Sequence, residues 1–503
     1  MNSDSLRFIL GLKLKQQRTQ KHLSLKAVAE KTGLSISYLS EIEKGKKYPK
    51  PEKLLQLSEV LGIPFDALVS TQLSDQLDPL RAFLGSEVLQ EFPFHLFGIT
   101  GQDLLDVVNQ EPERASALIR TLVEIAAEYD MQVEQFLYAA LRSWQAMQGN
   151  HFPDLEEAAR NFRSHFNWSP DADLDGDKLI RIARTHFDLH PDFSSMADQP
   201  DLVDLRSVRL EDSSPSRLLI NPRLRPAQRH FILLREIGYR ILGLINPPSV
   251  SGSGFSTAHS FEELMTYFKA SYFAGAVLLD ESELVRELRK VFDREEWDPQ
   301  SLQRLKQRYG VTPELFLYRL SQLIPGSLGL KQLYYQRFHH KIGTQDFLLT
   351  KRLNVTPIFM YHGIGLNENY CRRWTPIAQL RTLAQFPPQS PLTETYSTRR
   401  LRFLSSGAEF LTFSIARRLQ LKPDHLSAIS IGILLDDHAK NIIRFWNDPA
   451  IPVVEVHETC ERCALSELSC TDRATPNRIY QQQQKQHLQR VAFEKLLFNI
   501  KKE

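Results

Sequence analysis

Apolar residues recur every three or four positions through the first seventy residues, and short polar turns interrupt them. The pattern predicts helices over Leu6–Gln17, Leu25–Lys31 and Ile36–Glu43, a fourth that carries Leu54 to Leu61, and a short fifth that opens at Phe65. Ser24 and Ser35 stand directly before two of these segments, where a side-chain oxygen can cap a helix. Gly33 and Gly45 follow the same segments, where a left-handed residue commonly ends a helix. Two helices around a tight glycine turn predict a helix-turn-helix unit.

Beyond residue 70 the pattern changes from helices alone to helices mixed with strands. Residues 71–150 keep the helical spacing, for example over Val133–Met147, and are predicted as a helical linker or dimerisation region. Strand-like runs are predicted at Leu202–Leu210, Arg217–Asn221, 347–355, 356–363, Leu401–Leu404, Phe410–Ala416 and Ala428–Leu434. The fold class that follows is a mainly α N-terminal half, an α+β middle domain and an α+β C-terminal domain, with domains over 1–70, 71–150, 151–310, 311–480 and 481–503.

The last segment, 481–503, is predicted as a helix of its own. One helical stripe of it carries Leu488, Val491, Ala492, Lys495 and Leu496. Such a stripe can pack on the body of the chain or on a second subunit, and packing on the body is the favoured expectation.

Composition narrows the class of protein. A length of 503 residues corresponds to about three domains, and 42% hydrophobic with 24% charged residues argues against wholesale disorder. The N-terminus lacks the basic and apolar regions of a signal peptide, and no run of about 18 apolar residues exists that could span a membrane. Four cysteines are too few for a disulfide framework. We therefore expect a cytoplasmic protein without a membrane partner.

Charge is distributed unevenly along the chain. The formal net charge is only +2, but residues 1–53 hold twelve Lys and Arg against five Asp and Glu. This segment therefore carries +7, and the remaining residues carry −5. A small basic module on an acidic body is typical of a nucleic-acid-binding end piece, and the second helix of a helix-turn-helix can enter the major groove of DNA.

The run from Leu23 to Val69 resembles the Cro/C1-type helix-turn-helix of phage repressors and their bacterial relatives. The resemblance implies that Leu39 and Ile42 face the core. It implies that Ser35, Ile36, Ser37, Ser40 and Glu41 lie toward base edges, and that Tyr38, Lys44, Lys46 and Lys47 contact phosphates. Glu41 is acidic in this position, so it either accepts a hydrogen bond from a cytosine amino group or repels phosphate. The alternative to DNA binding is a charged helical bundle that binds protein.

The order of helices and strands from residue 150 to 310 resembles the ImmA/IrrE metallo-endopeptidase-like domain. Active members hold zinc through two histidines of an HExxH motif and a third acidic ligand. Here the motif reads Arg235-Glu236-Ile237-Gly238-Tyr239, and Lys269 occupies the place of the third ligand. Protonated Arg and Lys offer no lone pair to zinc. His230 and His259 are out of register and are expected to be surface or packed side chains, so we expect a degenerate domain without peptidase activity.

Three of the four cysteines, Cys460, Cys463 and Cys470, lie within eleven positions. Thiolates at this spacing can turn onto one metal ion or cluster, with Cys371 or His457 as a fourth ligand. The alternative is a set of unligated reduced thiols or a disulfide in an oxidised preparation. Arg462 and Arg473 either meet the phosphates of a CoA-type ligand or are ordinary solvated side chains.

The whole layout resembles short-chain fatty-acyl-responsive regulators, which combine a Cro/C1-type reader, a degenerate peptidase-like domain and a cysteine-bearing C-terminal region. Those relatives carry a C-x2-C-x4-C-x2-R-A-x-P pattern, whereas the second gap here is six residues. The resemblance implies a [4Fe–4S] cluster, with zinc as the alternative, and a nearby acyl-CoA.

The sequence therefore predicts a homodimeric regulator that binds a double-stranded DNA operator and senses a small metabolite, a short-chain acyl-CoA by resemblance. Two alternatives remain: a redox or iron sensor that acts through the cysteines, and a metalloprotease that cleaves a regulator.

Overall fold

The computed structural model describes residues 3–70, 94–97, 121, 133–168, 176–197, 199–210, 216–252, 260–356, 368–387 and 394–500. Within this part of the chain, contacts divide the molecule into two compact units. The first contains residues 1–144 and 258–264, and the second contains residues 145–257 and 265–503. Among the described helices, none is long and apolar enough to cross a membrane.

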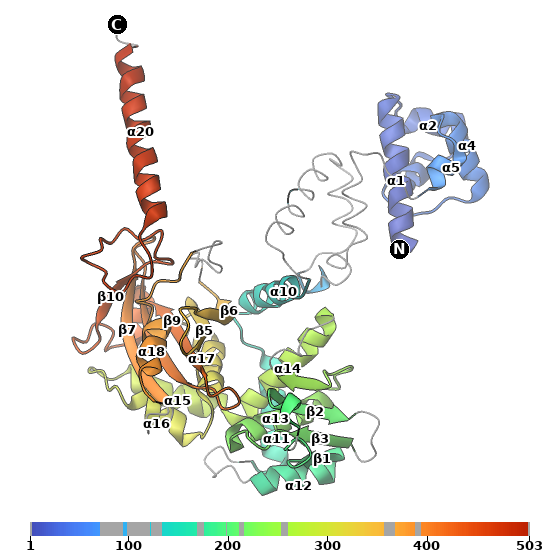
Figure 1. The fold of residues 1–503 in the computed structure, drawn as a ribbon. Helices are drawn as coiled ribbons and strands as arrows, with labels where there is room; N and C mark the ends of the chain where they lie inside the picture. Colours follow the sequence, from blue (N-terminus) through green and yellow to red (C-terminus); the bar gives the residue numbers. More distant parts are fainter. Residues whose placement is uncertain are drawn as a thin grey trace. The chain divides into compact units, whose positions relative to one another are not determined.

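The N-terminal head, residues 3–70, is a bundle of short helices (Figure 1). They are α1 (Ser3–Gln20), α2 (Leu25–Thr32), α3 (Ile36–Glu43), α4 (Pro51–Leu61) and α5 (Phe65–Val69). Ser24 and Ser35 cap α2 and α3, because their Oγ atoms accept from the N–H of Ala27 (3.1 Å) and Tyr38 (3.2 Å). Gly33 takes a left-handed conformation with φ of 69° at the turn between the two helices. The predicted caps and turn are confirmed.

The head is held by an apolar core and by a long-range ion pair. The core consists of Leu10, Leu14, Val28, Leu39, Ile42, Leu54, Leu57, Leu61 and Leu68. Arg18 of α1 makes a two-pronged ion pair with Glu43 at the end of α3, at 2.6 and 2.9 Å. A Cβ at Gly11 of α1 would stand 2.5 Å from the carbonyl oxygen of Ile42. Glycine is therefore needed where α1 crosses the end of α3.

Between the head and the middle domain, the structure describes η1 (Phe94–Phe97) and α10 (Val133–Met147). Helix α10 confirms the prediction over the same residues. The rest of the predicted linker, up to residue 132, lies outside the described residues.

The middle domain surrounds a four-stranded sheet with helices. Its strands are β1 (Leu189–Asp192), β2 (Leu205–Leu210), β3 (Ser216–Ile220) and β4 (Val250–Gly252), in the order β1-β3-β2-β4. Its helices are α11 (Pro153–His165), α12 (Gly176–Phe187), α13 (Pro226–Ile241), α14 (Phe261–Leu278), α15 (Glu281–Phe292), α16 (Ser301–Arg308) and α17 (Pro313–Ser327). The strand expected from Leu202 begins only at Leu205, because the 3-10 turn η2 (Pro200–Leu202) precedes it.

The C-terminal domain is built on a six-stranded sheet in the order β10-β7-β8-β9-β5-β6 (Figure 1). The strands are β5 (Leu333–Lys341), β6 (Leu348–Asn354), β7 (Glu394–Phe403), β8 (Glu409–Arg418), β9 (His425–Leu434) and β10 (Val453–Val456). Neighbouring strands are antiparallel, except that β10 runs parallel to β7 at the edge. The strand predicted at 347–355 is confirmed as β6, and most of 356–363 lies outside the described residues.

Helices α18 (Thr375–Ala384) and α17 cover the central strands, and the short α19 (Asp437–Ile442) follows β9. On the α18 side, Trp374, Ile377 and Leu380 pack against Phe403 of β7 and Phe410 of β8. Because helices cover both faces, the inner strands β8 and β9 are buried almost throughout, without strict alternation of buried and exposed positions. This packing fixes the segment around Cys371 against the sheet.

The last helix, α20 (Arg478–Ile500), differs from expectation in its packing. The helix forms as predicted, but its apolar side chains do not enter the core: Leu488 is 65% exposed and Leu496 56%. Phe493 and Leu497 are exposed as well. The expected packing on the body is therefore wrong, because α20 leaves its apolar positions in solvent within this chain.

Candidate functional site

The exposed face of α3 consists of the residues predicted to meet DNA. Ser35, Ile36 and Ser37 are exposed at the start of the helix, and Ile36 is 49% exposed although it is apolar. Leu39 and Ile42 are buried on the opposite side, as expected. An exposed isoleucine beside two serines offers apolar contact and hydrogen bonds to base edges, which is the chemistry of direct readout.

Two residues predicted to contact DNA, Tyr38 and Glu41, are half-buried and have partners within the head. Glu41 forms an ion pair with Lys47, with 2.8 Å between Oε2 and Nζ. Glu41 raises the pKa of Lys47 through this hydrogen bond. The Nζ of Lys53 lies 4.4 Å from the centroid of the Tyr38 ring, which orients that ring. Because Lys47 compensates its charge, Glu41 repels a phosphate less than an isolated acid would.

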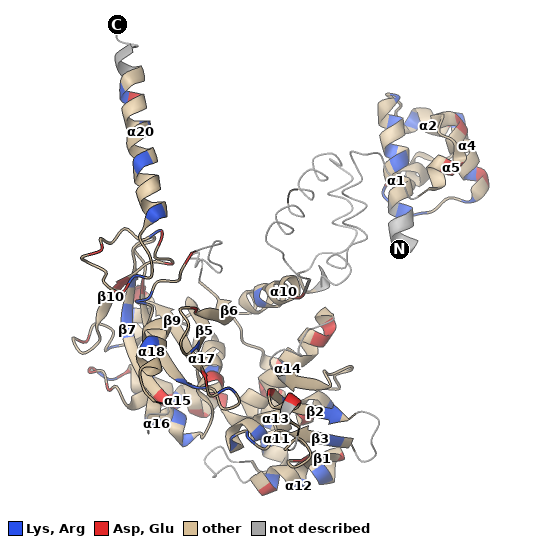
Figure 2. Ribbon diagram, in the orientation of Figure 1, with Lys and Arg blue, Asp and Glu red and all other residues tan. Residues whose placement is uncertain are grey.

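Basic residues surround this face. Lys44, Lys46 and Lys47 are exposed in the loop after α3, and further Lys and Arg lie along α1 and α2 (Figure 2). Ser40 is half-buried one turn from the exposed end of α3. The geometry is a convex reading helix flanked by cations, which suits insertion in a groove between two phosphate backbones.

The place of the former HExxH motif on α13 holds a buried network of charges. Arg235 and Glu236 are 3% and 2% exposed, with 3.5 Å between Nη2 and Oε1. Arg209 of β2 reaches the other carboxylate oxygen at 3.6 Å. Burial raises the pKa of Tyr239, which stands at the second histidine position. Guanidinium groups thus fill the space around the one remaining motif residue, Glu236.

On α14, Arg235 contacts Tyr267, two positions before Lys269, the residue at the place of the third zinc ligand. Tyr267 Oη accepts from Arg235 Nη1 at 3.2 Å, and the guanidinium carbon lies 5.0 Å from the ring centroid. Lys269 is half-buried, and no contact joins it to Arg235. His230 is buried on α13, and His259 lies outside the described residues. The network is therefore cation–carboxylate–phenol and offers no set of zinc donors.

The four cysteines converge although Cys371 is far from the others in sequence. Tyr370 pairs with Thr459 in an isolated antiparallel bridge. The N–H of Cys371 donates to the carbonyl of Glu458 (3.1 Å), and that of Cys460 donates to Asn369 (2.9 Å). Cys371, Cys460, Cys463 and Cys470 are each buried, and all are free of disulfides. This pairing places Cys371 beside the cysteine segment, as predicted for a fourth ligand.

Electrostatic coupling confirms that the thiols share one neighbourhood. Burial raises the pKa of Cys371 to about 12, and Cys460 and Cys463 add to this effect. Burial also raises the pKa of Cys463, with Cys470 and Cys460 contributing in the same direction. Metal binding requires thiolates. A buried thiol with a raised pKa therefore needs a bound cation to ionise near neutral pH.

The loop that carries the cysteines is fixed by buried hydrogen bonds. The carboxylate of Glu461, 1% exposed, accepts from the backbone and side-chain N–H groups of Asn369. The N–H of Ala474 donates to Cys460 Sγ at 3.4 Å, and Asn477 donates to the carbonyl of Cys463 at 2.9 Å. His457, the other fourth-ligand candidate, is paired with Glu458 at 2.7 Å. These contacts favour Cys371 over His457 as the fourth donor.

The two arginines predicted to meet a ligand have partners within the protein, although Nε and Nη1 of Arg473 are buried without a hydrogen-bond partner. Arg462 forms a two-pronged ion pair with the buried Glu368, at 2.7 and 2.8 Å. Arg473 donates to the carbonyl of Leu465 at 2.5 Å. Neither is among the residues that line the pocket described below. Other arginines line that pocket. Two of them, Arg372 and Arg373, directly follow Cys371 in the sequence, and this position was the signal that could have identified them.

That pocket has a volume of about 460 Å³ and lies between α18, β7 and the segment before β10. It is called the arginine pocket below and is lined by Arg372, Arg373, Ala378, Arg381, Thr382, Gln385, Arg399, Pro452, Val454 and Asp472. Burial lowers the pKa of Arg372 and of Arg399. Both remain protonated at neutral pH, because an arginine side chain does not lose its proton in proteins.

A further group of possible metal donors lies in the middle domain. His151, Glu156 and Glu281 bring three donor atoms within 4.8 Å of one another, the one such group of three among the described residues. Arg319 already occupies both oxygens of Glu156, at 2.6 and 2.7 Å. Tyr272 donates to the same carboxylate. The group is therefore a neutralised structural ion pair.

A head with an exposed helix-turn-helix face, on a chain whose HExxH position reads Arg235-Glu236-Ile237-Gly238-Tyr239, defines a DNA-binding transcriptional regulator. Comparison with known families agrees: residues 14–68 match the helix-turn-helix family model, and residues 196–321 match the IrrE N-terminal-like domain. The chain therefore carries an XRE-type helix-turn-helix domain at its N-terminus and an IrrE-like domain in its middle.

Curated relatives extend the similarity over almost the whole chain. The HTH-type transcriptional regulator RamB of Mycobacterium tuberculosis is 23% identical over 489 residues, which cover 93% of this chain and 94% of RamB. A propionyl-CoA carboxylase regulator of Cereibacter sphaeroides is 23% identical over 75% of this chain and 78% of its own length. The ImmF control region 10 kDa protein of Bacillus phage phi105 is 31% identical over 64 residues, 13% of this chain and 71% of that protein.

Proposed function

We propose that this regulator binds a pseudo-palindromic operator as a homodimer and changes its DNA affinity when its body binds a short-chain acyl-CoA. The exposed face of α3 carries the DNA part of the proposal. One helix-turn-helix covers only a half-site, so two copies are needed for a full operator. The apolar side chains that α20 leaves exposed, Leu488, Phe493, Leu496 and Leu497, are candidates for the contact between copies.

The acyl-CoA part of the proposal rests on similarity. One relative is named as a regulator of propionyl-CoA carboxylase, and its similarity covers 75% of this chain, far more than a helix-turn-helix head alone. A ligand acts on such a regulator only through a difference in affinity between the DNA-binding and non-binding states. Propionyl-CoA is therefore the first effector to test.

The DNA part is tested with an operator selected from random duplexes and two variants of the head. Ser37→Ala and Lys46→Ala should both weaken operator binding, each by about 1 kcal/mol or more. Only Ser37→Ala should relax sequence preference, because Ser37 faces base edges and Lys46 faces phosphate. The control is Lys485→Ala, an exposed lysine of α20. Equal losses on every sequence from both head variants would contradict the assignment of α3 to base reading.

For the cysteines, we propose a [4Fe–4S] cluster held by Cys371, Cys460, Cys463 and Cys470. The donor set fits, since four buried thiols meet in one place. A bound cluster would supply one-electron transfer, and its loss would make the site respond to oxidation.

Protein purified without oxygen distinguishes the alternatives. About four irons per chain with a broad absorption band near 400 nm would support the cluster, and one zinc would contradict it. If Cys460→Ser abolishes a response to oxidant while propionyl-CoA still changes DNA affinity, the regulator has a second input. That result would establish the redox-sensing alternative alongside the metabolite response.

We further propose that the middle domain works without peptidase chemistry. The supporting observation is the buried Arg235–Glu236–Arg209 network in the place of the zinc ligands. Stoichiometric zinc that depends on Glu236, together with cleavage of a protein substrate, would contradict this.

A further inference from the structure

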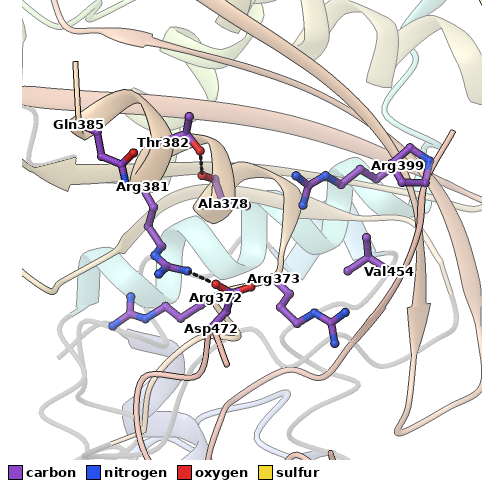
Figure 3. Close-up of a pocket in the computed structure, with 10 residues that line it drawn as sticks. Arg372, Arg373, Ala378, Arg381, Thr382, Gln385, Arg399, Val454 and Asp472 are labelled. Atoms are coloured by element: carbon purple, nitrogen blue, oxygen red, sulfur yellow. Dashed lines mark hydrogen bonds and ion pairs between the residues drawn. The ribbon is translucent and has the colours of Figure 1, made fainter. Parts of the chain in front are cut away.

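The arginine pocket has a charge that the protein does not neutralise. Four arginines line it, Arg372, Arg373, Arg381 and Arg399, against one acid, Asp472 (Figure 3). The lining therefore carries a formal +3. Unpaired charge in a partly buried cavity is costly to maintain, so a folded protein that keeps it has a reason to attract an anion.

Two of the four guanidiniums are occupied and two are not. Arg372 donates to the carbonyl of Gln345 at 2.9 Å, and Arg381 pairs with Asp472 at 3.2 Å. Arg373 and Arg399 are half-buried and have no hydrogen-bond or ion-pair partner within the described part of the chain. The free donors come from the turn before α18 and from β7, so they face the cavity from two elements.

We propose that the arginine pocket binds paired phosphate groups of a small molecule, such as a pyrophosphate ester. Guanidinium presents a planar fork that matches phosphate oxygens in pairs. A charge of +3 exceeds what a single carboxylate would compensate and suits a pyrophosphate group. The volume of about 460 Å³ lies in the range of small-molecule sites and exceeds the need of one phosphate.

The other residues that line the pocket indicate where the non-phosphate part of such a ligand would bind. Ala378, Pro452 and Val454 form an apolar part of the wall, and Thr382 and Gln385 add neutral polar groups. The phosphates would meet the arginines, while an attached organic group would contact the apolar part. A DNA backbone would instead need an extended basic surface.

The pocket and the cysteines share two stretches of chain. Arg372 and Arg373 directly follow Cys371, and Asp472 lies two positions after Cys470. A ligand that moves these side chains acts on the same segments that carry the cysteines. The inference rests on the proposed function in one respect, that the body of this regulator takes a small-molecule ligand.

The test is calorimetric titration of the full-length, oxygen-free protein with inorganic pyrophosphate, inorganic phosphate, ADP, CoA and dephospho-CoA. The variant is Arg373→Gln/Arg399→Gln, which removes the two unoccupied guanidiniums. The control is Arg402→Gln, an exposed arginine three positions along β7 whose side chain points to the other face of the strand. Thermal unfolding and operator binding of each variant show whether it is folded.

We expect pyrophosphate to bind more tightly than phosphate, and the double variant to lose at least tenfold in affinity, about 1.4 kcal/mol, while the control keeps it. If CoA binds much more tightly than ADP, the source of the phosphates is a CoA ester. If CoA and ADP bind with equal affinity, the ligand is a nucleotide. Affinity that is unchanged in the folded double variant, or binding of duplex DNA fragments in place of all five compounds, overturns the inference.

The acyl-CoA proposal fails in a different way. Suppose that propionyl-CoA leaves DNA affinity unchanged, while the Arg373→Gln/Arg399→Gln variant loses affinity for pyrophosphate. The phosphate site is then supported, and the acyl-CoA proposal is wrong. If propionyl-CoA acts equally on wild type and on the double variant, the proposed function stands and this site for it is wrong.

Discussion

The two arginine-rich sites of the body differ in what faces the guanidiniums. At the former peptidase site, Arg235 and Arg209 share the carboxylate of Glu236, and all three side chains are buried. In the arginine pocket, Arg373 and Arg399 face a cavity without a partner among the described residues. At the first site Glu236 compensates one of the two guanidinium charges from within the protein, whereas at the second site Arg373 and Arg399 are left to a ligand.

The difference indicates that the arginines of the Arg235–Glu236–Arg209 network have a structural role, whereas Arg373 and Arg399 of the arginine pocket have a role in ligand binding. A buried pair contributes little net stability, but it cannot lose one member without leaving an uncompensated charge. An unpaired, half-exposed guanidinium adds little to the fold, and its loss costs little. Stability and ligand affinity should therefore respond in opposite ways at the two sites.

The largest expected effect is at the former peptidase site. Glu236→Ala leaves Arg235 and Arg209 buried without their carboxylate, so we expect the free energy of unfolding of the body to fall by about 3 kcal/mol. Chemical unfolding followed by tryptophan fluorescence measures this. Replacing all three together, as Arg209→Leu/Arg235→Met/Glu236→Leu, should recover much of the loss. If the free energy of unfolding of Glu236→Ala stays within about 1 kcal/mol of wild type, the two guanidiniums do not depend on this carboxylate.

An effect of intermediate size is expected in the arginine pocket. Asp472→Asn removes the acid of its lining and releases Arg381, which raises the formal charge from +3 to +4. Pyrophosphate should bind up to about fivefold more tightly, because exposed ion pairs are worth at most about 1 kcal/mol. The gain should shrink at high salt. A loss of affinity would show that Asp472 orients Arg381 for the ligand and does not compete with it.

Sequence reasoning succeeded where the determinants are local. The caps Ser24 and Ser35 and the turn at Gly33 act within four residues, so spacing alone predicts the head. It missed the Arg18–Glu43 pair, which depends on how α1 crosses α3.

In the body the determinants are long-range. Arg462 and Arg473 were chosen because they neighbour the cysteines, but Glu368 and Leu465 engage them. The pocket instead takes Arg399 because β10 pairs with β7 across the sheet edge. The residues next to Arg399 in the sequence do not predict the pairing of β7 with β10.

The smallest expected effect is the stability of the pocket variants. Arg399→Gln removes a guanidinium that has no partner among the described residues, so the free energy of unfolding should stay within about 0.5 kcal/mol of wild type. The burial of Arg399 and its repulsion by Arg373 oppose its attraction to Asp472, so the net change in stability should be small. Urea unfolding of this variant beside Glu236→Ala gives the comparison in one experiment. A loss of more than about 1.5 kcal/mol would place Arg399 among the structural arginines and remove the distinction between the two sites, because an arginine needed for folding does not require a ligand to explain it.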